Sequence, residues 1–107
     1  MSNIIVERRG HVLLIGFNRP QKRNSLTLDM YYDLARAYGE LSSNKDLRCG
    51  LLYAVGDHFT SGLDLPQWGS VFSGGEWLEL EEGMIDPFGV DEDNRCKKPI
   101  VMACQGY

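Results

Sequence analysis

The chain opens with two short runs of aliphatic residues that predict strands. The runs cover residues 4–6 and 12–17, and Arg9, Gly10 and His11 separate them. Strands of this kind joined by a glycine-containing turn form a β-hairpin, because glycine adopts the positive φ angles of tight turns at little cost. The pattern therefore predicts a hairpin with Gly10 at its turn, followed by a polar loop over 18–25 that contains Pro20.

After this loop the apolar residues follow the spacing of a helix. They recur every three or four positions as Met30, Leu34, Ala37 or Tyr38, and Leu41. Thr27 suits the N-cap, and the polar residues 42–44 suit the end of the helix. We expect a helix over 27–42 that buries Met30, Leu34 and Leu41, with its tyrosines packed on the helix face rather than forming a binding surface.

Two later apolar runs predict further strands. Residues 49–55 and 100–104 lack polar alternation, which is typical of strands covered on both faces, and Cys49 and Cys104 are expected to fill these strands. A short helix over 65–71 is expected after Asp64. Strand, helix and strand in succession favour an α/β fold.

The segment of about 73–94 differs from the rest of the chain. It combines eight acidic residues with large apolar ones, and it contains no lysine or arginine. Because a linker would lack apolar anchors, we interpret the segment as a mobile lid rather than a linker.

Composition limits the function classes. With 107 residues and 43% apolar content, the chain suits a single domain or part of one, here residues 1–107. Its net charge of −4 disfavours nucleic acid, and no apolar run approaches the ~20 residues of a membrane helix. Three cysteines without a paired spacing indicate neither a disulfide framework nor a metal site. With no leader-like N-terminus either, we expect a soluble, cytoplasmic protein.

Three separated motifs carry a family resemblance. Asn18-Arg19-Pro20 with Asn24-Ser25-Leu26 is similar to an N-R-P…N-A-L element, and residues 56–65 resemble a G-x-x-F-C/S-A-G-x-D-L signature. Residues 98–107 resemble the K-P-V-I-A-A-V-x-G strand. Together, in this order, they resemble the N-terminal part of the crotonase superfamily, the enoyl-CoA hydratase/isomerase family.

The resemblance implies a spiral of β–β–α units, of which about half is present here, and an enzyme of fatty acid metabolism that binds an acyl-CoA thioester. It implies no cofactor beyond the coenzyme A of the substrate, and a homo-oligomer (a trimer or a dimer of trimers). The family's catalytic acids and second oxyanion glycine are expected after Tyr107, so we expect a truncated sequence or elements supplied by another chain. The alternative is a catalytically inactive binding or assembly module.

The resemblance also implies site residues. Leu63 would offer its backbone N–H to the thioester oxygen, which fits the general need of a developing oxyanion for fixed donors beside glycine. The expected substrate and CoA contacts are Lys22, Arg23, Ser25, Leu26, Ser61, Gly62, Leu63, Asp64 and Leu65. The expected acyl-chain contacts are Trp68, Phe72 and Trp77.

Two polar residues of the signature keep more ordinary interpretations. His58 is favoured as an exposed loop histidine over a general base. Asp64 is favoured as a helix cap over an acid catalyst.

Overall fold

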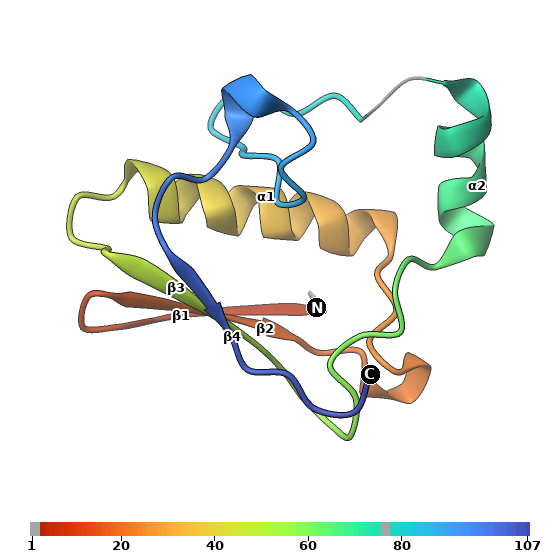
Figure 1. Ribbon diagram of the computed structural model, residues 1–107, viewed down its shortest axis with the longest axis horizontal. Helices are drawn as coiled ribbons and strands as arrows, with labels where there is room; N and C mark the ends of the chain where they lie inside the picture. Colours follow the sequence, from red (N-terminus) through yellow and green to blue (C-terminus); the bar gives the residue numbers. More distant parts are fainter. Residues whose placement is uncertain (1–2, 76–77) are drawn as a thin grey trace.

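The computed structural model describes residues 3–75 and 78–107, and they form a four-stranded sheet crossed by one long helix (Figure 1). The strands are β1 (Ile4–Arg9), β2 (Val12–Phe17), β3 (Cys49–Ala54) and β4 (Ile100–Met102). The helices are α1 (Leu28–Ser43) and α2 (Leu65–Gly74), with short 3-10 turns at Pro20–Lys22 and Glu92–Asn94. This mixed α/β arrangement confirms the fold class expected from the sequence.

The strands lie in the order in which they occur in the chain. β1 and β2 pair antiparallel, with Arg9 opposite Val12, so the predicted hairpin is confirmed and Gly10 has a φ of 61° in its turn. β3 pairs parallel to β2, and β4 pairs parallel to β3. Because a parallel pair needs a crossover connection, α1 must cross the sheet between β2 and β3.

Helix α1 covers one face of the sheet and forms the core with it. The hydroxyl of Thr27 accepts a hydrogen bond from the Met30 N–H at 3.1 Å, which confirms the predicted N-cap. Met30, Leu34 and Leu41 are buried as predicted. The core that they share with the strands consists of Ile4, Leu13, Ile15, Phe17, Leu26, Met30, Leu34, Ala37, Tyr38, Leu41, Leu47 and Leu52.

The buried surface of α1 is wider than the single stripe expected from its periodicity. Tyr31 and Ala35 are also fully buried, because residues 84–88 and α2 pack against this side of the helix. Ile85 donates its N–H to the Ala35 carbonyl at 3.1 Å. The tyrosines of α1 thus serve packing, as expected for Tyr31 and Tyr38, while Tyr32 is half-buried.

A buried carboxylate also attaches the acidic segment to α1, in addition to the hydrogen bond between Ile85 and Ala35. Asp86 is 2% exposed and accepts hydrogen bonds from the backbone N–H groups of Phe88, Val90 and Asp91. It also accepts one from the hydroxyl of Tyr31 at 3.1 Å. The mobility of residues 73–94 stays a prediction. The hydrogen bond between Asp86 and Tyr31 fixes one point of this segment on α1.

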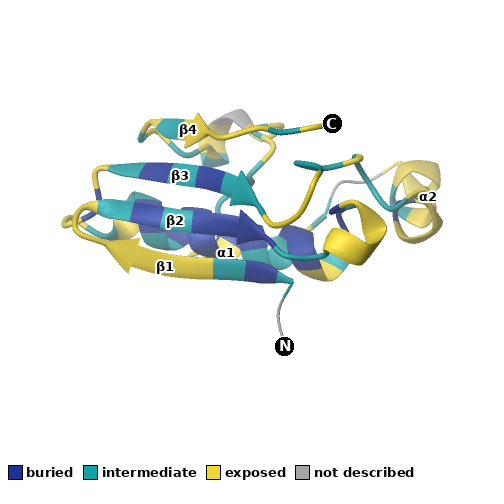
Figure 2. Cartoon of the chain, turned by 90° about the horizontal axis from the view of Figure 1, so that it is seen from below, coloured by how far each residue is buried: buried dark blue, intermediate teal, exposed yellow. Residues whose placement is uncertain are grey.

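Among the described residues, a helix covers one face of the sheet, and the cover expected on the second face of β3 and β4 stays a prediction. Only one face of the sheet carries α1, and Figure 2 shows burial concentrated in β2 and β3, with β1 and β4 largely exposed. β4 ends at Met102, and Val101 and Met102 are 60% and 56% exposed. Cys104 therefore lies beyond the strand and is exposed, and Cys49 is half-buried.

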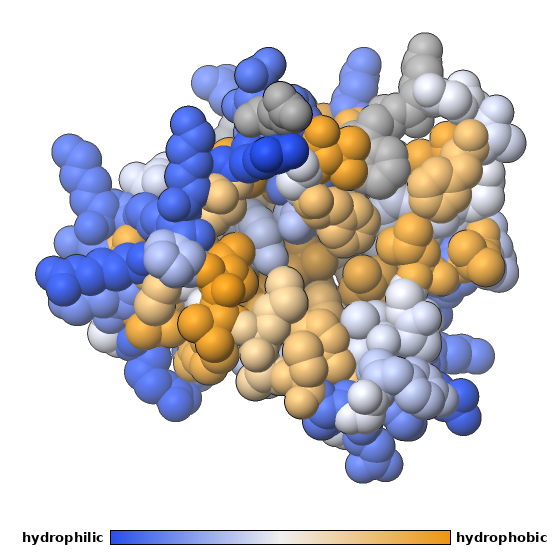
Figure 3. Space-filling view, viewed as in Figure 1, coloured by the Kyte–Doolittle hydropathy of each residue, from blue (hydrophilic) through white to orange (hydrophobic). Residues whose placement is uncertain are grey.

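Apolar side chains also gather on the surface at two places. Figure 3 shows them over α2, where Leu65 and Phe72 are exposed, and over β4, where Val101 and Met102 are exposed. Among the described residues, no helix is both long and apolar enough to cross a membrane.

Gly39 inside α1 and Gly69 inside α2 should respond oppositely to alanine. A Cβ at Gly39 would collide with the Gly83 carbonyl oxygen, whereas a Cβ at Gly69 would meet nothing within 4 Å. We expect Gly39→Ala to lower the free energy of unfolding by ~1–3 kcal/mol through overpacking. Gly69→Ala should raise it by ~0.5–1 kcal/mol through helix propensity. Urea unfolding followed by circular dichroism measures both, and a stable Gly39→Ala variant would contradict this packing.

Tyr38 should make stability fall at high pH. Burial, and secondly the electrostatic interaction with Cys96, raise the pKa of Tyr38 from 10.0 to about 12. The folded state thus favours the neutral phenol, so this contribution to stability is fully present below pH 10.0 and is lost as the pH rises through about 12. Tyr38→Phe should show a smaller loss of stability across this window. Unfolding measured at several pH values for both proteins tests it, and parallel pH profiles would count against it.

Candidate active site

Three segments that are far apart in the sequence meet beyond the carboxyl ends of β2 and β3. They are the loop after β2 (18–26), the loop after β3 (55–64) and the segment after β4 (103–107), and Figure 1 shows them together beside the C-terminus. The Leu26 N–H donates to the Gly62 carbonyl at 2.8 Å, and the Phe59 N–H donates to the Gln105 carbonyl at 2.7 Å. The first two motifs and the end of the third, residues 103–107, therefore form one cluster.

An isolated parallel bridge between Leu26 and Leu63 fixes the backbone of the signature loop. Two hydrogen bonds form this bridge. The Leu26 N–H donates to the Gly62 carbonyl at 2.8 Å, and the Asp64 N–H donates to the Leu26 carbonyl at 2.9 Å. In a strand, successive N–H groups point to opposite sides, so the Leu63 N–H points away from Leu26. Within the described residues this N–H has no hydrogen-bond partner.

The charge of Asp64 is balanced by Arg19. The Arg19 guanidinium lies 3.1 Å from the Asp64 carboxylate, with side-chain exposures of 15% and 18%, and it also donates to the Ser25 hydroxyl and carbonyl. Asp64 occupies the N-cap position of α2, but its side chain makes no cap hydrogen bond. The interpretation of Asp64 as a helix cap is thus correct for its position and wrong for its side chain, because the arginine competes for the carboxylate.

Four polar residues that hold these loops together were missed as site residues by sequence reasoning. They are Arg19, Asn24, Thr60 and Gln105, and their partners are mostly backbone groups of a neighbouring loop. The Gln105 amide, for example, donates to the carbonyls of Ala54 and Gly56, both at 3.0 Å. The available signal was that these polar residues, which have no evident reactive chemistry, lie inside the motifs that surround the Gly62-Leu63 turn.

The remaining polar candidates lie at the outer edge of the cluster. Lys22, Arg23 and Ser61 are exposed, and Arg23 donates to the Tyr107 hydroxyl at 2.8 Å. His58 is half-buried and stacks on the Tyr107 ring at 4.3 Å, so the expectation of a freely exposed histidine is wrong. The tyrosine ring shields it on one face.

The candidate acyl-chain residues differ in exposure. Trp68 is fully buried, and its indole N–H donates to the Leu26 carbonyl at 2.9 Å. The Phe72 ring stacks on it with 6.2 Å between the ring centroids, and Phe72 is 52% exposed. Leu65, which was expected as a substrate or CoA contact, is 68% exposed. Trp77 lies outside the described residues. The role of these residues toward an acyl chain stays a prediction.

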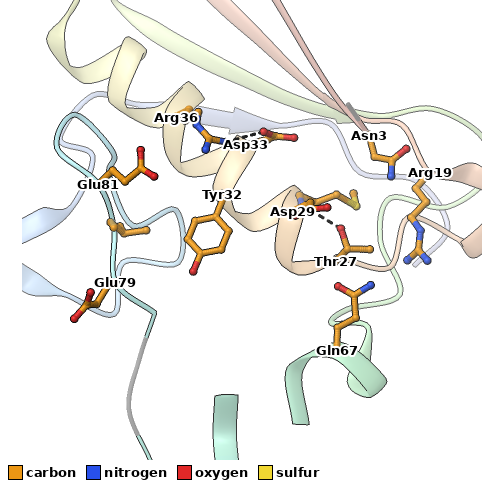
Figure 4. A pocket seen from close by; sticks show the side chains of 12 residues that line it. Asn3, Arg19, Thr27, Asp29, Tyr32, Asp33, Arg36, Gln67, Glu79 and Glu81 are labelled. Atoms are coloured by element: carbon orange, nitrogen blue, oxygen red, sulfur yellow. Dashed lines mark hydrogen bonds and ion pairs between the residues drawn. The ribbon is translucent and has the colours of Figure 1, made fainter. Parts of the chain in front are cut away.

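A pocket of about 830 Å³ has Arg19 in its lining (Figure 4). Residues of α1, the acidic segment and Gln67 line it, and the side chains of Asp29, Glu79 and Glu81 give it an acidic character. Neither Gly62 nor Leu63 lines it. Arg19 and Arg36 line the pocket beside these carboxylates.

Comparisons with known proteins agree with the fold and the motifs. No family model matches the chain. It is 31% identical over 105 residues to the enoyl-CoA hydratase EchA19 of Mycobacterium tuberculosis, covering 95% of this chain and 38% of the relative. It is 33% identical over 103 residues to a probable peroxisomal enoyl-CoA hydratase of Arabidopsis thaliana, covering 96% of this chain and 37% of the relative.

A solved structure is similar at the level of the backbone. The chain superposes on a probable enoyl-CoA hydratase/isomerase from Mycobacterium abscessus with a TM-score of 0.89 and 41% identity, covering 98% of this chain and 40% of that one. The chain belongs to the crotonase superfamily and corresponds to the N-terminal part of that fold. It spans less than half the length of these relatives.

Removing the Arg19 guanidinium should destabilise this cluster. Arg19→Ala leaves the poorly exposed Asp64 carboxylate without its ionic partner, so we expect a loss of ~1–3 kcal/mol in the free energy of unfolding. The matched control is Arg36→Ala, which breaks the pair with Asp33 at a side chain that is 56% exposed and should cost less than ~1 kcal/mol. Chemical unfolding gives both values. Equal losses would show that the Arg19–Asp64 pair behaves as a surface pair.

Proposed function

We propose that this chain supplies part of an acyl-CoA site in which the Leu63 N–H binds the thioester carbonyl oxygen. The enzyme would be an enoyl-CoA hydratase or isomerase. The observation that carries the proposal is that the Leu63 N–H has no partner among the described residues, while the bridge to Leu26 on the opposite side of the backbone holds it in place. A thioester oxygen that gains negative charge as an enolate forms is stabilised by fixed donors of this kind.

The local electrostatics favour a developing negative charge. Helix α2 begins at Leu65, two residues after the donor, so the positive end of its dipole lies close to the Leu63 amide. Asp64 would oppose this effect if its charge were free, but Arg19 lies 3.1 Å away and balances it. Gly62, with a φ of 103° and open space where a Cβ would be, leaves room for a ligand beside the donor.

The exposed lysine and arginine of the first loop fit the phosphate end of coenzyme A. Lys22 and Arg23 are both exposed, and the backbone of their loop is joined to the signature loop, since the Ser61 N–H donates to the Arg23 carbonyl at 3.0 Å. A flexible ammonium and a planar guanidinium are common phosphate partners. Phe72 and Leu65 offer apolar surface on α2 for an acyl chain.

The proposal assigns carbonyl binding to this chain and no proton transfer. Adding water to an enoyl-CoA, or shifting its double bond, needs acid and base groups that act on the carbons next to the thioester. No residue described here is given that role. The relatives include proteins named as hydratases and proteins named as isomerases, so both reactions stay within the proposal.

The decisive test replaces the donor itself. Leu63→Pro deletes the N–H and should lower turnover by ~10²–10³, the usual loss for one oxyanion donor. Leu63→Ala keeps the N–H, removes the same leucine side chain and should be much milder. Crotonyl-CoA hydration followed by ultraviolet absorbance measures both variants, in the protein expressed at the full length that its gene encodes.

Folding must be checked in the same experiment. Proline at position 63 also restricts Gly62, whose φ of 103° is unusual, so circular dichroism should establish that both variants fold. Equal activity of folded proline and alanine variants would remove Leu63 from the mechanism. If the unaltered protein binds acyl-CoA but catalyses neither hydration nor isomerisation of an enoyl-CoA, the result would favour the inactive binding module.

A further inference from the structure

Asn24 is the most completely buried polar side chain of the candidate site. It is 0% exposed, and both of its amide hydrogens and its oxygen are used. The amide nitrogen donates to the carbonyls of Val55 at 2.9 Å and His58 at 2.8 Å. The oxygen accepts the Arg19 N–H at 2.7 Å. One side chain therefore joins the loop after β2 to both sides of the turn that follows β3.

The backbone of Asn24 continues this connection toward Leu63. Its carbonyl accepts a hydrogen bond from the Thr60 hydroxyl at 2.7 Å, and the same hydroxyl accepts the Gly62 N–H at 3.1 Å. Two hydrogen bonds thus link Asn24 to the residue directly before Leu63. The bridge between Leu26 and Leu63, two residues further along, is held by the same pair of loops.

Asparagine suits this position for two separate reasons. Its φ is 55°, a left-handed conformation that asparagine tolerates better than most residues other than glycine. Its amide also offers two donors and an acceptor at the length needed here, where two carbonyls and one N–H converge. Aspartate has the same shape but would set a carboxylate oxygen against the two carbonyls.

We infer that Asn24 is a positioning residue that fixes the direction of the Leu63 N–H toward the thioester oxygen. Asn24 is buried away from any substrate, so it acts only through the loop that carries the donor. The inference rests on the proposed function of Leu63. Replacing Asn24 should weaken the polarisation of the thioester carbonyl more than it weakens the binding of acyl-CoA.

The test compares Asn24→Asp with a control of similar connectivity. Lys98 donates to the carbonyls of Leu41, Asn44 and Leu47, each at 2.7 Å, at the end of the sheet where β3 begins. Lys98→Met removes these three bonds far from the signature loop. The readouts are the thermal midpoint, kcat and KM for crotonyl-CoA, and the absorbance maximum of bound cinnamoyl-CoA, which moves to longer wavelength when its carbonyl is polarised. All three use the protein at the full length that its gene encodes.

We expect both variants to lower the thermal midpoint, and only Asn24→Asp to reduce the spectral shift. Its kcat should fall ~10–100-fold, a part of the loss for a whole donor, with KM changing less than about threefold. A spectral shift and kcat in Asn24→Asp equal to those of Lys98→Met would overturn the inference and leave Asn24 as a structural residue. If Asn24→Asp does not fold, Asn24→Gly keeps the left-handed backbone conformation with a φ of 55° and removes the side-chain amide, and the same two outcomes apply.

The unaltered protein separates this inference from the proposed function. If cinnamoyl-CoA binds it without a spectral shift, no donor polarises the carbonyl, and the proposed function fails together with the inference. If the unaltered protein gives the shift and the folded Asn24→Asp variant keeps it in full, only the inference fails.

Discussion

The parallel pairing of β2 with β3 is the constraint on which the candidate site depends. The two strands run in register from Val12 opposite Cys49 to Phe17 opposite Ala54, so their carboxyl ends stop at the same edge of the sheet. The loops that follow must then leave the sheet side by side, which brings the first motif against the second. A parallel pair can form only if the chain crosses back over the sheet, and α1 provides that crossing while it covers the core.

Burying a polar side chain between these loops costs free energy unless its donors and acceptors form hydrogen bonds. This cost explains why the buried polar side chains of the cluster are hydrogen-bonded so completely. Asn24 is buried with both donors and its oxygen engaged, and Arg19 and Asp64 are largely buried as a pair. A buried polar group without a partner costs ~1–3 kcal/mol, so such a cluster is stable only when its members are satisfied together. Two polar groups of the cluster have no partner among the described residues: the Leu63 N–H, on a half-buried residue, and the buried Nδ1 atom of His58.

The sheet has unequal faces. α1 covers the side chains of Leu13, Ile15 and Leu52, while Leu14 and Leu51, on the other face, are only half-buried. β4 contacts a single neighbouring strand, and its Val101 and Met102 are exposed. Apolar strands of this composition are usually covered on both faces, and the relatives that share this fold are more than twice as long as this chain.

The sequence by itself determined the local elements and the family. The period of Met30, Leu34 and Leu41, the cap at Thr27 and the turn at Gly10 depend on neighbouring residues, so the helix and the hairpin could be predicted correctly. The three motifs identified the crotonase superfamily because their order and spacing are specific. Leu63 was named as a donor through that resemblance, and its role stays a proposal.

Only the tertiary structure decided how the polar residues are paired. Asp64 binds Arg19, 45 residues away, rather than capping α2, and His58 stacks on Tyr107. The buried role of Asn24 depends on carbonyls of Val55 and His58, which approach it only after β2 and β3 have paired. Burial of Tyr31 likewise arises from contacts with Trp68 and Phe88. Such long-range partners leave no periodic signal in the sequence, because they are set by which loops the sheet brings together.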